Sequence, residues 1–78
     1  MVNIHLQKTI LDVVENQIRE NNPPATKKTF DRLLKNGHSE DDAMKLIGSA
    51  VAIEIYEVLK NKKPFDEKRY LKALRKLP

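Results

Sequence analysis

Three breaks in the sequence constrain its fold more than any other feature, because each one interrupts a helical pattern of apolar residues. They are Asn21-Asn22-Pro23-Pro24, the stretch around Gly37, and Asn61-Lys62-Lys63-Pro64. Between them, apolar residues recur every three or four positions, which predicts helices at about 4–20, 24–36, 40–61 and 67–76. No stretch alternates apolar and polar residues as a β-strand would. The sequence therefore predicts an all-α fold, a compact four-helix domain over residues 1–78 with the third helix at its centre.

Local signals mark the ends of these helices. Pro24 suits a first helical position, where a backbone N–H is not needed. Gly37 suits the left-handed residue that follows a helix. Ser39 and Asp66 can each accept a hydrogen bond from a free N–H group in the first turn of the helix that follows. The predicted helices therefore have defined ends as well as a helical period.

The composition limits how this fold can be stabilised and where the protein can act. The chain has 78 residues and no cysteine, so neither a disulfide nor a cysteine zinc site is available. Its N-terminus lacks the basic and apolar regions of a signal peptide. The uncharged run 46–53 is far shorter than the ~20 residues of a membrane span. We therefore expect a soluble, cytoplasmic protein with no membrane partner, stabilised by its apolar core.

One acidic residue, Glu54, stands in the most apolar part of the third segment, LIGSAVAIEIYEVL. On a helical projection with Leu46 at zero, Glu54 falls at ~80°, within the sector of the apolar residues. Gln17 has a matching position in the apolar face of the first segment. A buried polar group without a partner costs ~1–3 kcal/mol, so we expect Gln17 to donate its amide to Glu54. Three further residues are considered as members of this cluster: Tyr56, Tyr70 and His5.

Three interpretations of this polar pair stay open from the sequence. The pair can fix the register of helices in a small core, as buried polar residues sometimes do. Glu54 can instead meet a basic group of a second subunit. The pair can also belong to a ligand or metal site. The first interpretation is the simplest, because it needs nothing beyond the chain itself.

The positive charge of the protein is concentrated at its end. The formal net charge is +4, yet residues 1–59 carry seven Lys/Arg against nine Asp/Glu, and residues 60–78 carry eight against two. Five basic residues are predicted on the side of the last helix opposite its apolar edge: Lys68, Arg69, Lys72, Arg75 and Lys76. Such a face can bind nucleic acid or an acidic partner, although it can equally be an ordinary solvated face.

Residues that catalytic and metal sites require are scarce in this sequence. The two histidines, His5 and His38, lack the HxxxH or HExxH spacing of a histidine metal site. The acidic run 40–42 lacks the alternating oxygen ligands and central glycine of a calcium loop. With only Gly37 and Gly48, the chain has no glycine-rich phosphate loop. We therefore predict no cofactor, no metal ligand and no catalytic residue, and an enzymatic function is disfavoured.

Several motifs together resemble a small bacterial family that is known only as a domain of unknown function. They are IHL, VVENQI, PP, AMKLIGSAVAIEIYE and KPFDEKRYLKALRKLP, and they span residues 3–78. The resemblance implies a compact helical domain without an established activity. It also implies histidine in many relatives at positions 11 and 45, where Leu11 and Lys45 cannot serve as metal ligands. Glu15, Gln17 and Glu54 stand at matching positions, and we take them as the candidate buried polar residues.

The leading functional hypothesis is a non-enzymatic interaction or structural module. Homodimerisation is part of this hypothesis, because the third helix has more apolar surface than three short neighbours can cover. The alternative is nucleic-acid or acidic-partner binding through the basic stretch 60–76. A third hypothesis is a metal- or ligand-binding helical domain.

Overall fold

The computed structural model describes the backbone of residues 4–78 and the side chains of residues 7–78. Its four helices are α1 (Ile4–Glu20), α2 (Pro24–Lys35), α3 (Glu40–Asn61) and α4 (Glu67–Arg75). All four predicted helices are present, and α2 and α4 each end one residue earlier than predicted. Residues 4–78 contain no strand, so the predicted all-α fold is confirmed. None of the described helices is long and apolar enough to cross a membrane.

The helix ends carry the caps that the sequence predicts. The Ser39 side chain and Asp66 Oδ1 each accept a hydrogen bond, at 3.1 Å, from the backbone N–H three residues later. Pro24 is the first residue of α2. Gly37 has a φ of +100°, a left-handed conformation that glycine adopts at little cost. These ends follow from local chemistry, which is why the sequence predicts them well.

The end of α1 uses asparagine where the end of α2 uses glycine. Asn21 has a φ of +53°, in the left-handed region that asparagine tolerates better than most residues. Its N–H donates to Ile18 O at 3.2 Å, and the Asn22 N–H donates to Gln17 O at 3.0 Å. These two bonds satisfy carbonyl groups that the last helical turn leaves free. The chain therefore turns sharply after α1, and α2 begins close to Gln17.

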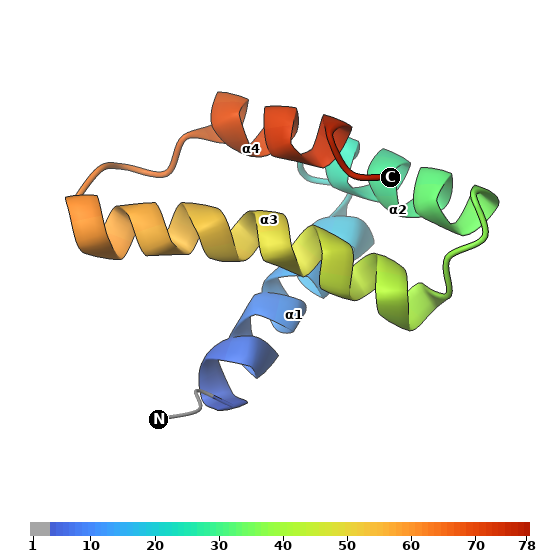
Figure 1. Ribbon diagram of the computed structural model, residues 1–78, viewed down its shortest axis with the longest axis horizontal. Helices are drawn as coiled ribbons and strands as arrows, with labels where there is room; N and C mark the ends of the chain where they lie inside the picture. The colour runs from blue at the N-terminus through green and yellow to red at the C-terminus, as the bar shows by residue number, and fades with distance from the viewer. Residues whose placement is uncertain (1–3) are drawn as a thin grey trace.

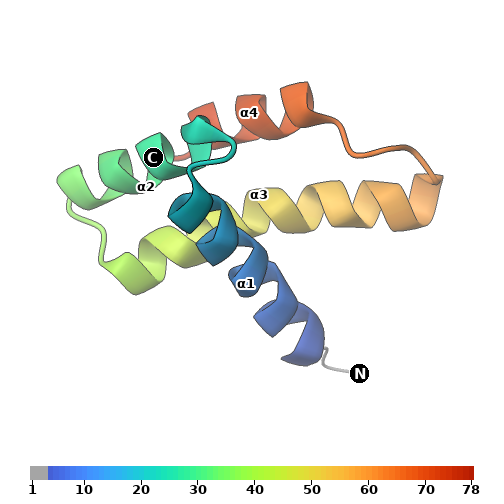
Figure 2. The same ribbon diagram turned by 180° about the vertical axis from the view of Figure 1, so that it is seen from behind.

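Helix α3 is the central element of the fold (Figure 1). It packs against α1, α2 and α4. Helices α2 and α4 lie along one side of α3, whereas α1 crosses a face of α3 so that its C-terminal end reaches α2 and its N-terminal end lies away from α2 and α4 (Figures 1 and 2). The apolar core between these helices consists of Val14, Leu33, Ala43, Ile47, Ala50, Val51, Tyr70 and Leu74. The predicted central position of the third helix is therefore confirmed.

Helix α1 crosses α3 at Gly48, which is buried. A Cβ atom at this position would lie 3.3 Å from Ile10 Cγ2 and 3.7 Å from Leu11 Cδ2. The absence of a side chain thus allows the two helices to approach closely. Gly48 lies outside the apolar sector of the third helix on the helical projection, and it is nevertheless buried because α1 packs against it.

Candidate functional site

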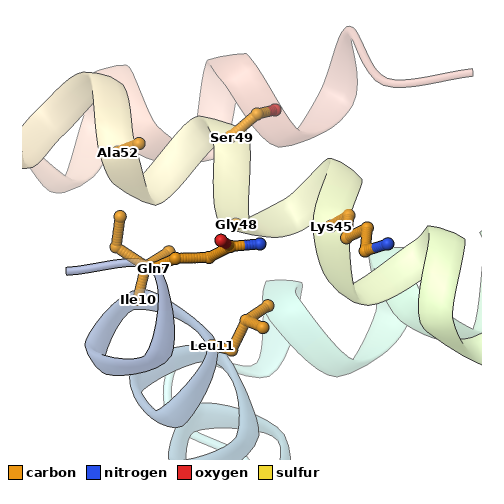
Figure 3. Close-up of a pocket in the computed structure, with 7 residues that line it drawn as sticks. All are labelled: Gln7, Ile10, Leu11, Lys45, Gly48, Ser49 and Ala52. Carbon is orange, nitrogen blue, oxygen red and sulfur yellow. The ribbon is translucent and has the colours of Figure 1, made fainter. Parts of the chain in front are cut away.

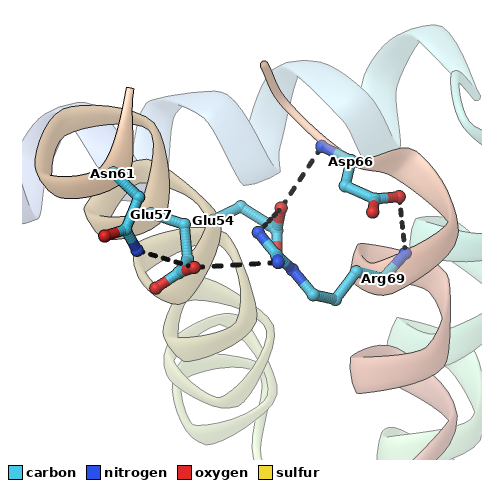
Figure 4. Close-up of polar contacts among 5 residues, drawn as sticks. All are labelled: Glu54, Glu57, Asn61, Asp66 and Arg69. Atoms are coloured by element: carbon cyan, nitrogen blue, oxygen red, sulfur yellow. Dashed lines mark hydrogen bonds and ion pairs between the residues drawn. The ribbon is translucent and has the colours of Figure 1, made fainter. Parts of the chain in front are cut away.

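Glu54 is buried, as its helical position predicts, with 1 % of its surface exposed. Its carboxylate faces α4, where the Arg69 guanidinium binds it through two hydrogen bonds (Figure 4). Arg69 Nε lies 2.7 Å from Oε2, and Arg69 Nη2 lies 3.1 Å from Oε1. The Asp66 N–H also donates to Oε1, at 3.3 Å. The carboxylate therefore has charge-assisted partners for both of its oxygens.

The same arginine joins a second carboxylate at the edge of the protein. Arg69 Nη1 lies 3.7 Å from Glu57 Oε1, which also accepts a hydrogen bond from Asn61 Nδ2 at 3.0 Å (Figure 4). The hydrogen bond with Glu54, followed by the attraction of the nearby carboxylates, raises the pKa of Arg69 above its ordinary value. Arg69 is thus a permanent cation that holds the N-terminal turn of α4 against the C-terminal half of α3.

Gln17 belongs to a different network from Glu54, so the predicted hydrogen bond between these two residues is wrong. Gln17 Oε1 accepts hydrogen bonds from Thr26 Oγ1 and from Tyr70 Oη, both at 2.8 Å. The two hydroxyl groups lie 3.2 Å from each other. Thr26 and Tyr70 both have 0 % of their surface exposed. One amide oxygen therefore connects α1, α2 and α4, as expected of a polar group that fixes helix register.

A Gln17→Met variant should lose about 1–2 kcal/mol of unfolding free energy, because the two buried hydroxyls lose their shared acceptor. Urea denaturation followed by circular dichroism would measure the loss. Combined with Tyr70→Phe, the total loss should be smaller than the sum of the single losses, since both changes remove the same hydrogen bond. Strict additivity would contradict the shared network.

The other residues considered for this cluster lie elsewhere. Glu15 is not a buried polar residue, because its side chain is 66 % exposed and pairs with Arg19 at 3.8 Å. Tyr56 is 56 % exposed. The side chain of His5 lies outside the described residues. From residue 7 onward, no group of three or more His, Cys, Asp or Glu side chains is placed to hold a metal ion.

The predicted basic face is changed in two ways by the packing of α4. Lys68, Lys72, Arg75 and Lys76 are exposed, as predicted. Arg69 does not belong with them, because its guanidinium is bound to Glu54 and its side chain is only 37 % exposed. In addition, α2 lies against α4 and brings further basic residues beside this face: Lys28 and Arg32.

Helices α1 and α3 together expose an apolar surface on the side of α3 away from α4. We define the α1–α3 surface as Ile10, Leu11, Ala52, Ile53, Ile55, Tyr56 and Leu59. Near the helix crossing it forms a hollow of about 290 Å³ in which Gln7, Ile10 and Leu11 face Lys45, Gly48, Ser49 and Ala52 (Figure 3). Toward the end of α3 it forms a second hollow of about 380 Å³, lined by residues that include Ile53 and Leu59, which are 55 % and 71 % exposed. The expected excess of apolar surface on the third helix is therefore present.

Positions 11 and 45, where the family resemblance implies histidine in many relatives, lie on opposite walls of the first hollow (Figure 3). Here Leu11 supplies an apolar wall. Lys45 pairs with Asp41 at 3.1 Å on the surface of α3. In this chain the hollow is therefore largely apolar, with a cation at its rim.

Comparison with known proteins gives a family but no described relative. No curated protein and no solved structure matches the chain. A family model described as a domain of unknown function, DUF1841, matches residues 2–76, which is nearly the whole sequence. The chain therefore belongs to the DUF1841 family of domains of unknown function.

Proposed function

We propose that this protein is a non-enzymatic interaction module that associates with a second copy of itself through the α1–α3 surface. The observation that carries the proposal is the exposure of large apolar side chains on one face of α3. Ile53, Tyr56 and Leu59 are 55 %, 56 % and 71 % exposed. Scattered apolar residues are normal on a surface, but three within two helical turns beside an apolar hollow are typical of an interface.

The shape of the α1–α3 surface favours a second copy over an unrelated partner. One hollow lies around Gly48 and Ser49, and a second is lined by Tyr56 and Leu59, which are 56 % and 71 % exposed. Gly48 and Tyr56 are each four residues from Ala52. A two-fold axis that crosses α3 near Ala52 would therefore put the exposed Tyr56 and Leu59 side chains of each copy against the first hollow of the other. Such self-complementarity is what a two-fold symmetric interface requires.

The charges at this surface also fit an antiparallel pair of α3 helices. Lys45 is neutralised by Asp41, and Lys60 Nζ lies 5.2 Å from the centre of the Tyr56 ring on its own helix. No carboxylate lies among the residues that line the two hollows. Association would therefore bury apolar area without burying an unpaired acidic group, which would be costly.

The expected dimer is of moderate affinity. In each copy, the side chains of Ile53, Tyr56 and Leu59 would each bury on the order of 100 Å² of surface. The residues around the hollow and its polar rim would bury the remaining area of the interface. The interface then lies near the lower limit of about 1,200 Å² in total that is usual for stable complexes. A dissociation constant on the order of 10 μM is expected, so the oligomeric state should change with concentration.

A Leu59→Lys variant should abolish self-association, because it places a charge in the centre of the apolar contact. Sedimentation equilibrium at protein concentrations from about 1 μM to 500 μM would measure the self-association. This range includes concentrations below and above the expected dissociation constant. Asn61→Lys is the matched control, since it adds the same charge two residues further along α3 but outside the α1–α3 surface. The wild type and the control should dimerise, and the Leu59 variant should not. A wild-type protein that is a monomer at the highest concentration would contradict the proposal.

A further inference from the structure

A groove separate from the α1–α3 surface runs between α2 and α4. We define the α2–α4 groove as Ala25, Lys28, Thr29, Arg32, Leu71, Leu74 and Arg75. Its volume is about 520 Å³. The less polar part of the groove consists of four residues: Ala25 and Thr29 from α2, and Leu71 and Leu74 from α4. The remaining three are all basic, so the groove combines an apolar floor with a basic rim.

Two of the three basic residues of the groove have no acidic partner among the described side chains. Among the side chains of residues 7–78, no carboxylate forms an ion pair with Lys28 or Arg75, whereas Arg32 is held by backbone oxygens near the end of α4. Two lysines of α4, Lys68 and Lys72, and the residue that follows the helix, Lys76, are also exposed. By contrast, Lys8, Arg19, Lys27 and Lys45 each have an acidic neighbour one helical turn away. The cations without an acidic partner among the described side chains therefore include Lys28 and Arg75 at this groove, the exposed lysines beside α4, and Lys35 at the end of α2.

Arg32 is fixed in place before any partner binds. Its Nη2 donates to Leu74 O at 2.9 Å, and its Nη1 donates to Leu77 O and to Pro78 O, both at 2.8 Å. These acceptors are carbonyls in the last turn of α4 and just beyond it, at the helix end that carries a partial negative charge. Arg32 therefore joins α2 to the end of α4, and it presents a cation at the groove with little conformational freedom left to lose.

We propose that the α2–α4 groove binds an amphipathic helix of another protein whose apolar residues are flanked by aspartate and glutamate. The apolar floor accepts the apolar side chains of such a helix, and the basic rim accepts its carboxylates. A nucleic acid fits less well, because its phosphate chain has no apolar face. The groove also contains no aromatic side chain on which a base could stack.

This site is independent of the proposed dimer. The α2–α4 groove is lined by residues of α2 and α4 alone, whereas the α1–α3 surface is lined by residues of α1 and α3. A dimer formed through the α1–α3 surface would therefore leave both α2–α4 grooves open. A monomeric protein could bind the same helix.

The test uses a fluorescent peptide of about 18 residues, five helical turns, with leucine at helical spacing and glutamate at most other positions. Its binding is measured by fluorescence anisotropy in about 0.15 M salt, where long-range charge effects are screened. A peptide of the same composition with scrambled leucine positions tests the apolar floor. A fluorescent DNA duplex tests the nucleic-acid alternative. We expect micromolar binding of the amphipathic peptide, roughly tenfold weaker binding of the scrambled peptide, and still weaker binding of the duplex.

Matched variants locate the site. Lys28→Gln with Arg75→Gln should weaken peptide binding roughly tenfold, because two of the three groove cations are lost. Lys62→Gln with Lys63→Gln removes the same charge outside the groove and should change binding by no more than about twofold. Leu59→Lys should leave peptide binding unchanged, which separates this site from the dimer surface. Equal binding of the scrambled peptide, tighter binding of the duplex, or equal effects of the two double variants would overturn the proposal.

Discussion

An Arg69→Leu variant should be strongly destabilised, because the Glu54 carboxylate then has no cation. Glu54 is 1 % exposed, and it keeps only the hydrogen bond from the Asp66 N–H when the two from the guanidinium are lost. Because the Arg69 side chain is 37 % exposed and the pair is therefore only partly shielded from water, the loss of these charge-assisted hydrogen bonds costs about 2–3 kcal/mol. A domain of this size has a total stability of only about 4–12 kcal/mol. Thermal unfolding followed by circular dichroism should therefore show a melting temperature lower by more than about 10 °C.

The control for this prediction is the neighbouring residue Lys68. It is exposed and has no carboxylate partner among the described side chains, so Lys68→Leu should change stability by less than about 0.5 kcal/mol. A second change tests the cause of the loss. Adding Glu54→Gln to Arg69→Leu replaces the buried charge with a neutral amide and should restore part of the stability. A double variant that is no more stable than Arg69→Leu would mean that the buried charge is not the cause.

The burial of Glu54 could be predicted from the sequence, whereas its partner could not. Burial follows from helical periodicity, which places Glu54 among the apolar residues of its own helix. The partner depends on how α4 returns along α3 after the break at residues 62–66. Lys62 has a φ of +53°, a conformation that nothing in its residue type predicts. The turn brings Arg69, fifteen residues away in sequence, to Glu54.

The assignment of Arg69 to the basic face was wrong for a related reason. A helical projection gives the direction of a Cα–Cβ bond, and Arg69 does point away from the apolar edge of its helix. The arginine side chain is long enough to turn back toward α3 and place its charge on Glu54. A helical projection also describes only one helix at a time. It therefore cannot show that Lys28 and Arg32 of α2 lie beside Arg75 of α4.

For the polar cluster around Gln17, the sequence predicts some of the members but not all of them. Its place in the apolar face predicts that its side chain needs partners, and Tyr70 was among the residues considered. Thr26 was not, because nothing in its residue type distinguishes a buried threonine from an exposed one. The left-handed Asn21 turns the chain so that the first turn of α2, with Thr26, packs beside Gln17. The one signal that could have pointed to Thr26 is its position two residues after Pro24, at the start of a helix.

The stability of the protein should fall at alkaline pH because of Tyr70. Burial raises the pKa of the Tyr70 hydroxyl above its ordinary value of 10.0, and the hydrogen bond with Thr26 offsets this only in part. The unfolded chain then releases the tyrosine proton at a lower pH than the folded protein does. The stabilising contribution of Tyr70 to the free energy of unfolding is therefore fully present below about pH 10. It is lost as the pH rises through the raised pKa of Tyr70 in the folded protein. The loss has a maximum slope of about 1.4 kcal/mol per pH unit.

Comparison of the wild type with Tyr70→Phe isolates this contribution from those of the other residues, which the two proteins share. At pH 7 the variant should be less stable by about 1–2 kcal/mol, because the Gln17 oxygen loses one of its two donors. Above pH 10 the difference should shrink, since only the wild type must keep a buried phenol protonated. Urea denaturation of both proteins between pH 7 and pH 11 would measure this difference in unfolding free energy. Tyr56→Phe is the matched control, because Tyr56 is 56 % exposed and its replacement removes a hydroxyl group outside the buried network of Gln17, Thr26 and Tyr70. A stability difference between the wild type and Tyr70→Phe that stays constant up to pH 11 would contradict this account of Tyr70.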